Sequence, residues 1–162
     1  MSDIRIRKRK RMRERDAKNL SSLLEDTMGV PVFGDEPIDM AESTDFKLIF
    51  VGSEILGLVH EEKPFLTIRG ILKYKPGKRY VTVDMGAVPF ITNGADAMGP
   101  GITDADPEIE VGDMVWIRDM RNEIPLAVGV ALRPAAELME KKQGKAVTTI
   151  HNVGDRLWKY GE

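Results

Sequence analysis

Residues 94–102 read Gly94-Ala95-Asp96-Ala97-Met98-Gly99-Pro100-Gly101-Ile102, and this stretch decides the fold of the C-terminal half. Its glycines permit backbone angles that other residues resist, and they let another backbone come close. Peptide N–H groups exposed in such a loop can bind phosphates or base edges. Glycines at this spacing more often mark a plain tight turn, so the spacing alone favours the turn over a binding loop.

The segments on either side of this loop predict a small, mainly β domain. Short runs rich in Val, Ile, Leu and Thr between turn residues indicate strands. Pro134 suits the first position of a helix and Gly144 its end. The expected strands are 80–84, 114–117, 126–132, 147–150 and 157–160, and the expected helices are 86–94 and 134–144. Many short strands with two small helices are typical of a partly closed β-barrel, a pseudo-barrel.

The break Lys75-Pro76-Gly77-Lys78 predicts a domain boundary that divides the chain into residues 1–76 and 77–162. The first half predicts a small α+β domain. Its expected strands are 4–11, 46–51 and 55–60, and its expected helices are 12–28 and 64–74. Residues 30–45 are expected to be a polar loop with weak strand signals. Gly29 is expected to cap the first helix, and Phe65, Ile68, Ile71 and Leu72 are expected to face inward from the second.

Charge is distributed unevenly along the chain. The 162 residues carry a net charge of −2, yet residues 1–18 contain nine basic and three acidic side chains, so this segment is +6 and the remainder −8. A basic block on an acidic body is a candidate surface for phosphate backbones. We expect sequence-independent phosphate contacts from Arg9, Lys10, Arg11 and Arg13. A solvated charged tail is the alternative.

Several chemistries lack their residues. The sequence has no cysteine and only two histidines, His60 and His151, far apart in the chain. Thiolate or zinc sites and disulfides are therefore not expected, and no metal or other cofactor is implied. No paired carboxylate motif or phosphate loop occurs in the first half. Because the residues of these catalytic sites are missing, a non-catalytic protein is expected. The sequence has neither a secretory signal nor a long apolar run, so a cytoplasmic protein is expected.

The second half resembles the PUA domain, on motifs that occur in PUA order over residues 79–160. These are Val83-Asp84-x-Gly86-Ala87, Gly94–Ile102, Val111-Gly112-Asp113-x-Val115, Leu126–Val130, Gly144–Val147 and Ile150-His151-x-x-x-Asp155-x-Leu157-Trp158. In this fold the first helix and the glycine loop face RNA. The resemblance therefore places Ala87, Asn93, Gly94, Ala95, Asp96, Met98, Pro100 and Gly101 at the site, flanked by Lys145, Arg156 and Lys159.

The tail Ile150–Trp158 and the segment Pro64-Phe65-Leu66-Thr67-Ile68-Arg69 resemble the malignant-T-cell-amplified-sequence family. Its members have a small α+β domain ahead of a PUA domain and act with the small ribosomal subunit and tRNA. The resemblance implies binding of a tRNA acceptor end or of small-subunit rRNA, in translation initiation or recycling. It also raises a density-regulated protein as a possible partner.

Two other functions stay open. Many PUA domains accompany RNA-modifying enzymes, so the chain could be an accessory RNA-binding subunit for pseudouridylation or tRNA base exchange. A ribosome-associated protein-interaction module is the third possibility, because a pI of 5.8 is low for a pure RNA binder. Trp158 is expected in the core, although it could stack on a base. Gly129 is expected to serve close packing within a strand.

Overall fold

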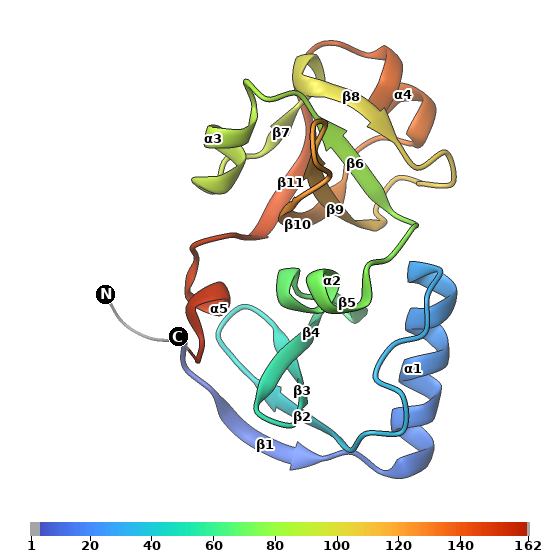
Figure 1. Ribbon diagram of the computed structural model, residues 1–162, viewed down its shortest axis with the longest axis vertical. Coiled ribbons are helices and arrows are strands. Elements are labelled where there is room, and N and C mark those ends of the chain that lie inside the picture. The colour runs from blue at the N-terminus through green and yellow to red at the C-terminus, as the bar shows by residue number, and fades with distance from the viewer. Residues whose placement is uncertain (1–3, 162) are drawn as a thin grey trace. The chain divides into compact units, whose positions relative to one another are not determined.

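The computed structural model describes residues 4–161, and these fold as two compact units (Figure 1). Of these, residues 4–77 and 159–161 form the first unit, and Lys78–Trp158 form the second. Each unit has a sheet of its own, of five strands in the first and six in the second. The second unit thus ends at Trp158, whereas the expected domain 77–162 runs to the C-terminal residue.

The first unit is an antiparallel sheet in the order β1-β2-β3-β4-β5 with two helices. Its strands are β1 (Arg7–Arg11), β2 (Ile38–Glu42), β3 (Lys47–Val51), β4 (Glu54–His60) and β5 (Lys63–Leu66), and its helices are α1 (Glu14–Met28) and α2 (Ile68–Tyr74). Gly29 ends α1 with a φ of 77°, which confirms the predicted cap. Leu24 and Met28 of α1 are fully buried.

Three predictions for the first unit are wrong. The expected polar loop 30–45 contains β2, whose five residues pair one to one with β3. The expected helix 64–74 begins as β5, because Glu61 and Glu62 both take positive φ and turn the chain back onto β4. The helix starts only after Thr67, whose hydroxyl accepts from the Gly70 amide. Leu72, expected to face inward, is 44% exposed.

The second unit has a mixed six-stranded sheet in the order β7-β11-β10-β9-β6-β8. Its strands are β6 (Tyr80–Val83), β7 (Ala97–Met98), β8 (Ile102–Ala105), β9 (Met114–Asp119), β10 (Pro125–Ala131) and β11 (Lys145–Asn152). Its short helices are α3 (Val88–Thr92), the 3-10 turn η1 (Gly99–Gly101) and α4 (Ala135–Glu140). Only β6 and β9 run parallel.

The chain connectivity forces this sheet to curl. The edge strands β7 and β8 are joined by the three residues of η1. In a flat six-stranded sheet the edges would lie about 24 Å apart, whereas a link of this length spans at most about 14 Å. The two edges must therefore approach each other. They are not hydrogen-bonded, which agrees with the predicted pseudo-barrel. We call the β7–η1–β8 connection, residues 97–105, the seam.

The end of the second unit departs from the expected strand 157–160. Residues Arg156–Lys159 form one helical turn, α5, because the Asp155 carboxylate accepts from the Trp158 amide at 2.8 Å and caps it. Leu157 is buried, while Trp158 is only partly buried. Trp116 of β9 is a core tryptophan, and its indole N–H donates to the Lys78 carbonyl at 2.8 Å. Tyr160 packs edge-on against Phe50 of β3, with ring centroids 5.8 Å apart.

Candidate nucleic-acid interface

The glycine loop, residues 94–101, follows α3 and shares residues 97–101 with the seam (Figure 1). The Phe90 carbonyl accepts from the amides of Asn93 and Ala95, at 3.2 and 2.9 Å, and so ends α3 and starts the loop. Gly94 follows with a φ of 94°, which side chains rarely adopt. A Cβ there would meet only the Asn152 Oδ1, at 3.6 Å. The glycine at position 94 is therefore required by backbone conformation, and space remains beside it.

The other two glycines of the loop are required by packing. A Cβ on Gly99 would collide with the Lys141 carbonyl, and Gly99 donates to the Gly144 carbonyl at 2.8 Å. A Cβ on Gly101 would lie 3.2 Å from the Cβ of Ala87. The Asp84 amide donates to the Gly101 carbonyl at 2.8 Å, and the Asp84 carboxylate caps Ala87. The predicted residues Ala87, Pro100 and Gly101 thus lie together where α3 meets the seam.

Asp96 ties the loop to β11. One carboxylate oxygen accepts from the Thr149 amide at 2.8 Å, and the other lies 2.9 Å from the Lys145 Nζ. Burial opposes ionisation of Asp96, but the Lys145 hydrogen bond and the Thr149 amide outweigh it and lower the pKa of Asp96. Thr149 Oγ1 also donates to the Ala95 carbonyl. Asp96 and Ala95 therefore hold the loop in place, and Lys145 carries a charge that is already paired.

Two apolar side chains of this region are exposed to solvent. Phe90 of α3 is 68% exposed and Met98 of β7 is 48% exposed. Ala97 fills the core, so alternation along strand β7 directs Met98 outward, and in helix α3 it is Ile91 that faces the core while Phe90 faces solvent. The resemblance points to Met98 but not to Phe90. Two large apolar residues in succession, Phe90 and Ile91, in so short a helix are the signal that could have identified Phe90, because only one of them can face the core.

The remaining predicted residues are divided between the units. Arg156, in α5, is exposed and belongs to the second unit, whereas Lys159 clusters with the first. Asn93 caps the end of α3 beside Gly94. The structure also brings Asn152, which the sequence does not single out, beside Gly94. Its signal would have been a polar residue at the end of the strand that borders the loop.

The basic segment forms the edge strand β1, all five residues of which are exposed. Arg9 and Arg11 both hold Asp39, with N–O distances of 2.7 and 2.6 Å, and Arg9 stacks on the Phe50 ring. The hydrogen bonds from Arg11 and Arg9 lower the pKa of Asp39. Within residues 4–161, no ion pair involves the side chains of Lys10 and Arg13.

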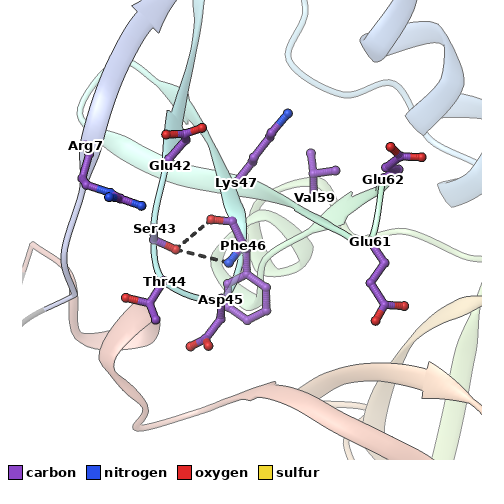
Figure 2. Close-up of a pocket in the computed structure, with 10 residues that line it drawn as sticks. All are labelled: Arg7, Glu42, Ser43, Thr44, Asp45, Phe46, Lys47, Val59, Glu61 and Glu62. Carbon is purple, nitrogen blue, oxygen red and sulfur yellow. Dashed lines mark hydrogen bonds between the residues drawn. The ribbon is translucent and has the colours of Figure 1, made fainter.

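A pocket of about 270 Å³ lies in the first unit (Figure 2). The turn 43–47 forms one side, where the Ser43 hydroxyl bridges the backbone of Phe46, and the Glu61–Glu62 turn forms another. Its lining mixes carboxylates with Arg7 and Lys47.

Across the described part of the chain, no group of three or more His, Cys, Asp and Glu side chains could hold a metal ion. No helix described by the structure is long and apolar enough to cross a bilayer.

Comparison with known proteins identifies the second unit. A model of the PUA domain matches residues 79–153. The fold of the chain is similar to that of a conserved PUA domain protein from Thermoplasma acidophilum, with a TM-score of 0.78 and 29% identity, covering 93% of this chain and 97% of that one. A protein from Pyrococcus horikoshii gives the same TM-score at 30% identity, with 93% and 98% covered.

The similarity extends beyond the PUA domain. An uncharacterized protein of Methanocaldococcus jannaschii is 37% identical over 161 residues, which cover 96% of this chain and 98% of the relative. Translation machinery-associated protein 20 of Eremothecium gossypii is 30% identical over 124 residues, with 73% and 68% covered. Malignant T-cell-amplified sequence 1 of Rattus norvegicus is 30% identical over 116 residues, with 69% and 64% covered. The chain therefore belongs to the family of PUA-domain proteins that includes Translation machinery-associated protein 20 and the malignant-T-cell-amplified-sequence proteins.

Proposed function

We propose that this protein is a cytoplasmic, non-catalytic RNA-binding protein of the translation machinery, and that the glycine loop seats the acceptor end of tRNA or a segment of small-subunit rRNA. The observation that carries the proposal is the exposed apolar surface of Phe90 and Met98 beside a glycine loop in a PUA domain. Unpaired RNA is bound by aromatic side chains and close backbone approach. Relatives named for the translation machinery support the biological setting.

The residues proposed for this site differ in whether their side chains are available to contact RNA. Gly94, Met98 and Asn93 are exposed. Lys145 lies at the loop but is paired with Asp96, and Arg156 is an exposed cation of the same unit. Ala87, Ala95, Asp96, Pro100 and Gly101 would act through the shape that they give to the loop. Lys159 belongs to the first unit, so its part in the same site is the least supported.

Gly94→Val tests the loop. The larger side chain occupies the space beside Asn152 and strains the positive φ. We expect at least a tenfold loss of affinity for tRNA or for the small-subunit rRNA fragment that wild type prefers, and unchanged affinity for an unrelated RNA duplex. Fluorescence anisotropy titrations measure both, and circular dichroism checks the fold.

Gly52→Ala is the control for Gly94→Val. It also places a Cβ at a positive φ, 63°, but with no heavy atom within 4 Å and in the other unit. It should bind every RNA as wild type does. Tight binding of tRNA and rRNA by a folded Gly94→Val variant would remove the loop from the RNA site.

The basic segment should contribute a separate, sequence-independent attraction. Because Arg9 and Arg11 are engaged with Asp39, we expect Lys10 and Arg13 to supply most of it. The double variant Lys10→Gln, Arg13→Gln should bind all RNAs more weakly and flatten the log–log salt dependence by about 0.7–0.9 for each phosphate group that is no longer neutralised. Titrations at several salt concentrations measure the slope. An unchanged slope would assign Lys10 and Arg13 to a solvated edge.

Arg9→Gln, Arg11→Gln is the matched comparison for the salt experiment. It removes the same charge but leaves the partly buried Asp39 unpaired, so its main effect should be a lower free energy of unfolding.

The acidic remainder of the chain favours contacts with basic ribosomal proteins as well. The small ribosomal subunit and a density-regulated-type protein are the partners that we propose to test by co-sedimentation.

A further inference from the structure

We propose that Phe90 and Asn152 together bind one unpaired nucleotide whose base carries an exocyclic amino group, with Phe90 stacking on the base and Asn152 Oδ1 accepting from the amino group. This inference rests on the proposed RNA-binding function and assigns the two side chains that would choose the nucleotide.

The orientation of the Asn152 amide is fixed by its surroundings. Its Nδ2 donates to the Thr92 carbonyl at 3.1 Å and to the Val153 carbonyl at 3.0 Å, so both amide hydrogens are used. A flipped amide would place its oxygen against these two carbonyl oxygens, which repel it. Oδ1 must therefore point away from them, on the side of Gly94.

This amide oxygen is available to a ligand. Among residues 4–161, no group donates a hydrogen bond to Asn152 Oδ1, and the oxygen is not one of the buried side-chain atoms without a partner. It therefore reaches solvent. A Cβ at position 94 would lie 3.6 Å from this oxygen, in van der Waals contact. A large side chain at position 94 would therefore compete with a ligand for the space beside the oxygen, in addition to straining the φ of 94°.

Phe90 lies in α3, four residues before Gly94, and supplies an exposed apolar surface. The Phe90 carbonyl accepts from the amides of Asn93 and Ala95, and the Thr92 carbonyl accepts from Asn152 Nδ2. Phe90 therefore belongs to the same turn, 90–95, to which the Asn152 amide is hydrogen-bonded. A phenyl ring that is 68% exposed contributes little to the core. A nucleobase offers a flat face for such a ring and hydrogen-bond donors at its edge.

The chemistry of Asn152 Oδ1 restricts the base. An amide oxygen only accepts hydrogen bonds, so it pairs with a donor at the base edge. Adenine, cytosine and guanine offer an exocyclic amino group, whereas uracil offers only its ring N–H. Purine, which has neither an amino group nor a ring N–H at that edge, leaves the oxygen unpaired. The site thus takes an end or a loop of RNA whose base is free, because in a duplex the neighbouring bases cover the face on which Phe90 would stack.

The test uses the full chain and two RNA hairpins with a four-nucleotide 3′ overhang, ending in adenosine or in purine riboside, which lacks the 6-amino group. Wild type should bind the adenosine hairpin about fivefold more tightly. Asn152→Ala should bind both hairpins equally. Phe90→Ala should lose about tenfold in affinity for both hairpins, while Phe90→Trp should retain binding. Because the ring is exposed, Phe90→Ala should leave the melting temperature unchanged.

The results separate the two proposals. Equal binding of both hairpins by wild type, or wild-type affinity in Phe90→Ala, would overturn the nucleotide assignment while RNA binding itself stands. Failure of wild type to bind the hairpins, tRNA and rRNA fragments would overturn the proposed function. Loss of discrimination in Asn152→Ala, together with rescue by Phe90→Trp, would support both.

Discussion

Gly129→Ala is expected to lower the free energy of unfolding of the second unit by about 2–4 kcal/mol. Gly129 lies in β10, where its backbone meets β11 so closely that a Cβ would collide with the Thr148 carbonyl and press on Val147. The ladder between β10 and β11 also shifts register at this point. The added methyl group must therefore separate two central strands, whereas most surface substitutions displace nothing.

The effect should appear as a melting temperature at least about 10 °C below that of wild type, by calorimetry. Gly77→Ala is the control, because Gly77 has no positive φ and no heavy atom within 4 Å of the added Cβ. That variant should melt at the wild-type temperature or slightly above. Equal melting temperatures for Gly129→Ala and wild type would mean that the strands are farther apart than the structure has them.

Asp155→Ala should have the second large effect, a loss of about 2–4 kcal/mol in the free energy of unfolding. The Asp155 carboxylate accepts from the His151 Nδ1 at 2.8 Å and from the amides of Asn152 and Trp158 at 2.9 and 2.8 Å. His151 is only 1% exposed, so its buried ring would lose a carboxylate partner, and the amides of Asn152 and Trp158 would lose theirs as well. Urea denaturation of both proteins at neutral pH measures the loss.

The same carboxylate makes stability depend on pH. Burial opposes ionisation of Asp155, but its hydrogen bond and charge interaction with His151, and the two amides, outweigh it and lower the pKa below its ordinary value of 3.8. A carboxyl with a lowered pKa stabilises the fold above its unfolded pKa and loses that contribution as the pH falls through the folded pKa.

Below about pH 4, wild type should therefore lose more stability than Asp155→Asn, which has the same size without the titrating group. Asp104→Asn replaces an exposed carboxylate in the same unit and should follow wild type at every pH. Parallel acid profiles for wild type and Asp155→Asn would show that Asp155 is not the group responsible.

Much of the second unit can be predicted from the sequence, because its signals are local. Val and Thr alternate in β6, Pro134 precedes α4, and the glycines punctuate the turns, so these elements are predicted within a few residues of their bounds. The strand β5 cannot be found in this way. Its pattern at Phe65, Ile68 and Ile71 fits a helix, and only the pairing with β4, which depends on two glutamates at positive φ, selects the strand.

In the candidate site, too, local features can be predicted from the sequence, whereas contacts between distant residues cannot. The glycine loop is predictable as a motif, but the roles of its residues depend on partners elsewhere in the chain. Asp96 is occupied by Thr149 and Lys145, 53 and 49 positions away, and Asn152 approaches Gly94 only because β11 borders the seam. Likewise, the basic residues of β1 look equivalent in sequence, and it is Asp39 that distinguishes Arg9 and Arg11 from Lys10.

The return of Tyr160 to Phe50 makes the second unit an insertion within the first. In an unfolded chain, bringing residue 160 back to the first unit closes a loop of about eighty residues, at an entropic cost on the order of 4 kcal/mol. Folding of Lys78–Trp158 fixes the ends of this loop and removes most of that cost. The two units are thus thermodynamically coupled through chain connectivity alone, and a variant that unfolds the second unit should also release the C-terminal residues from the first.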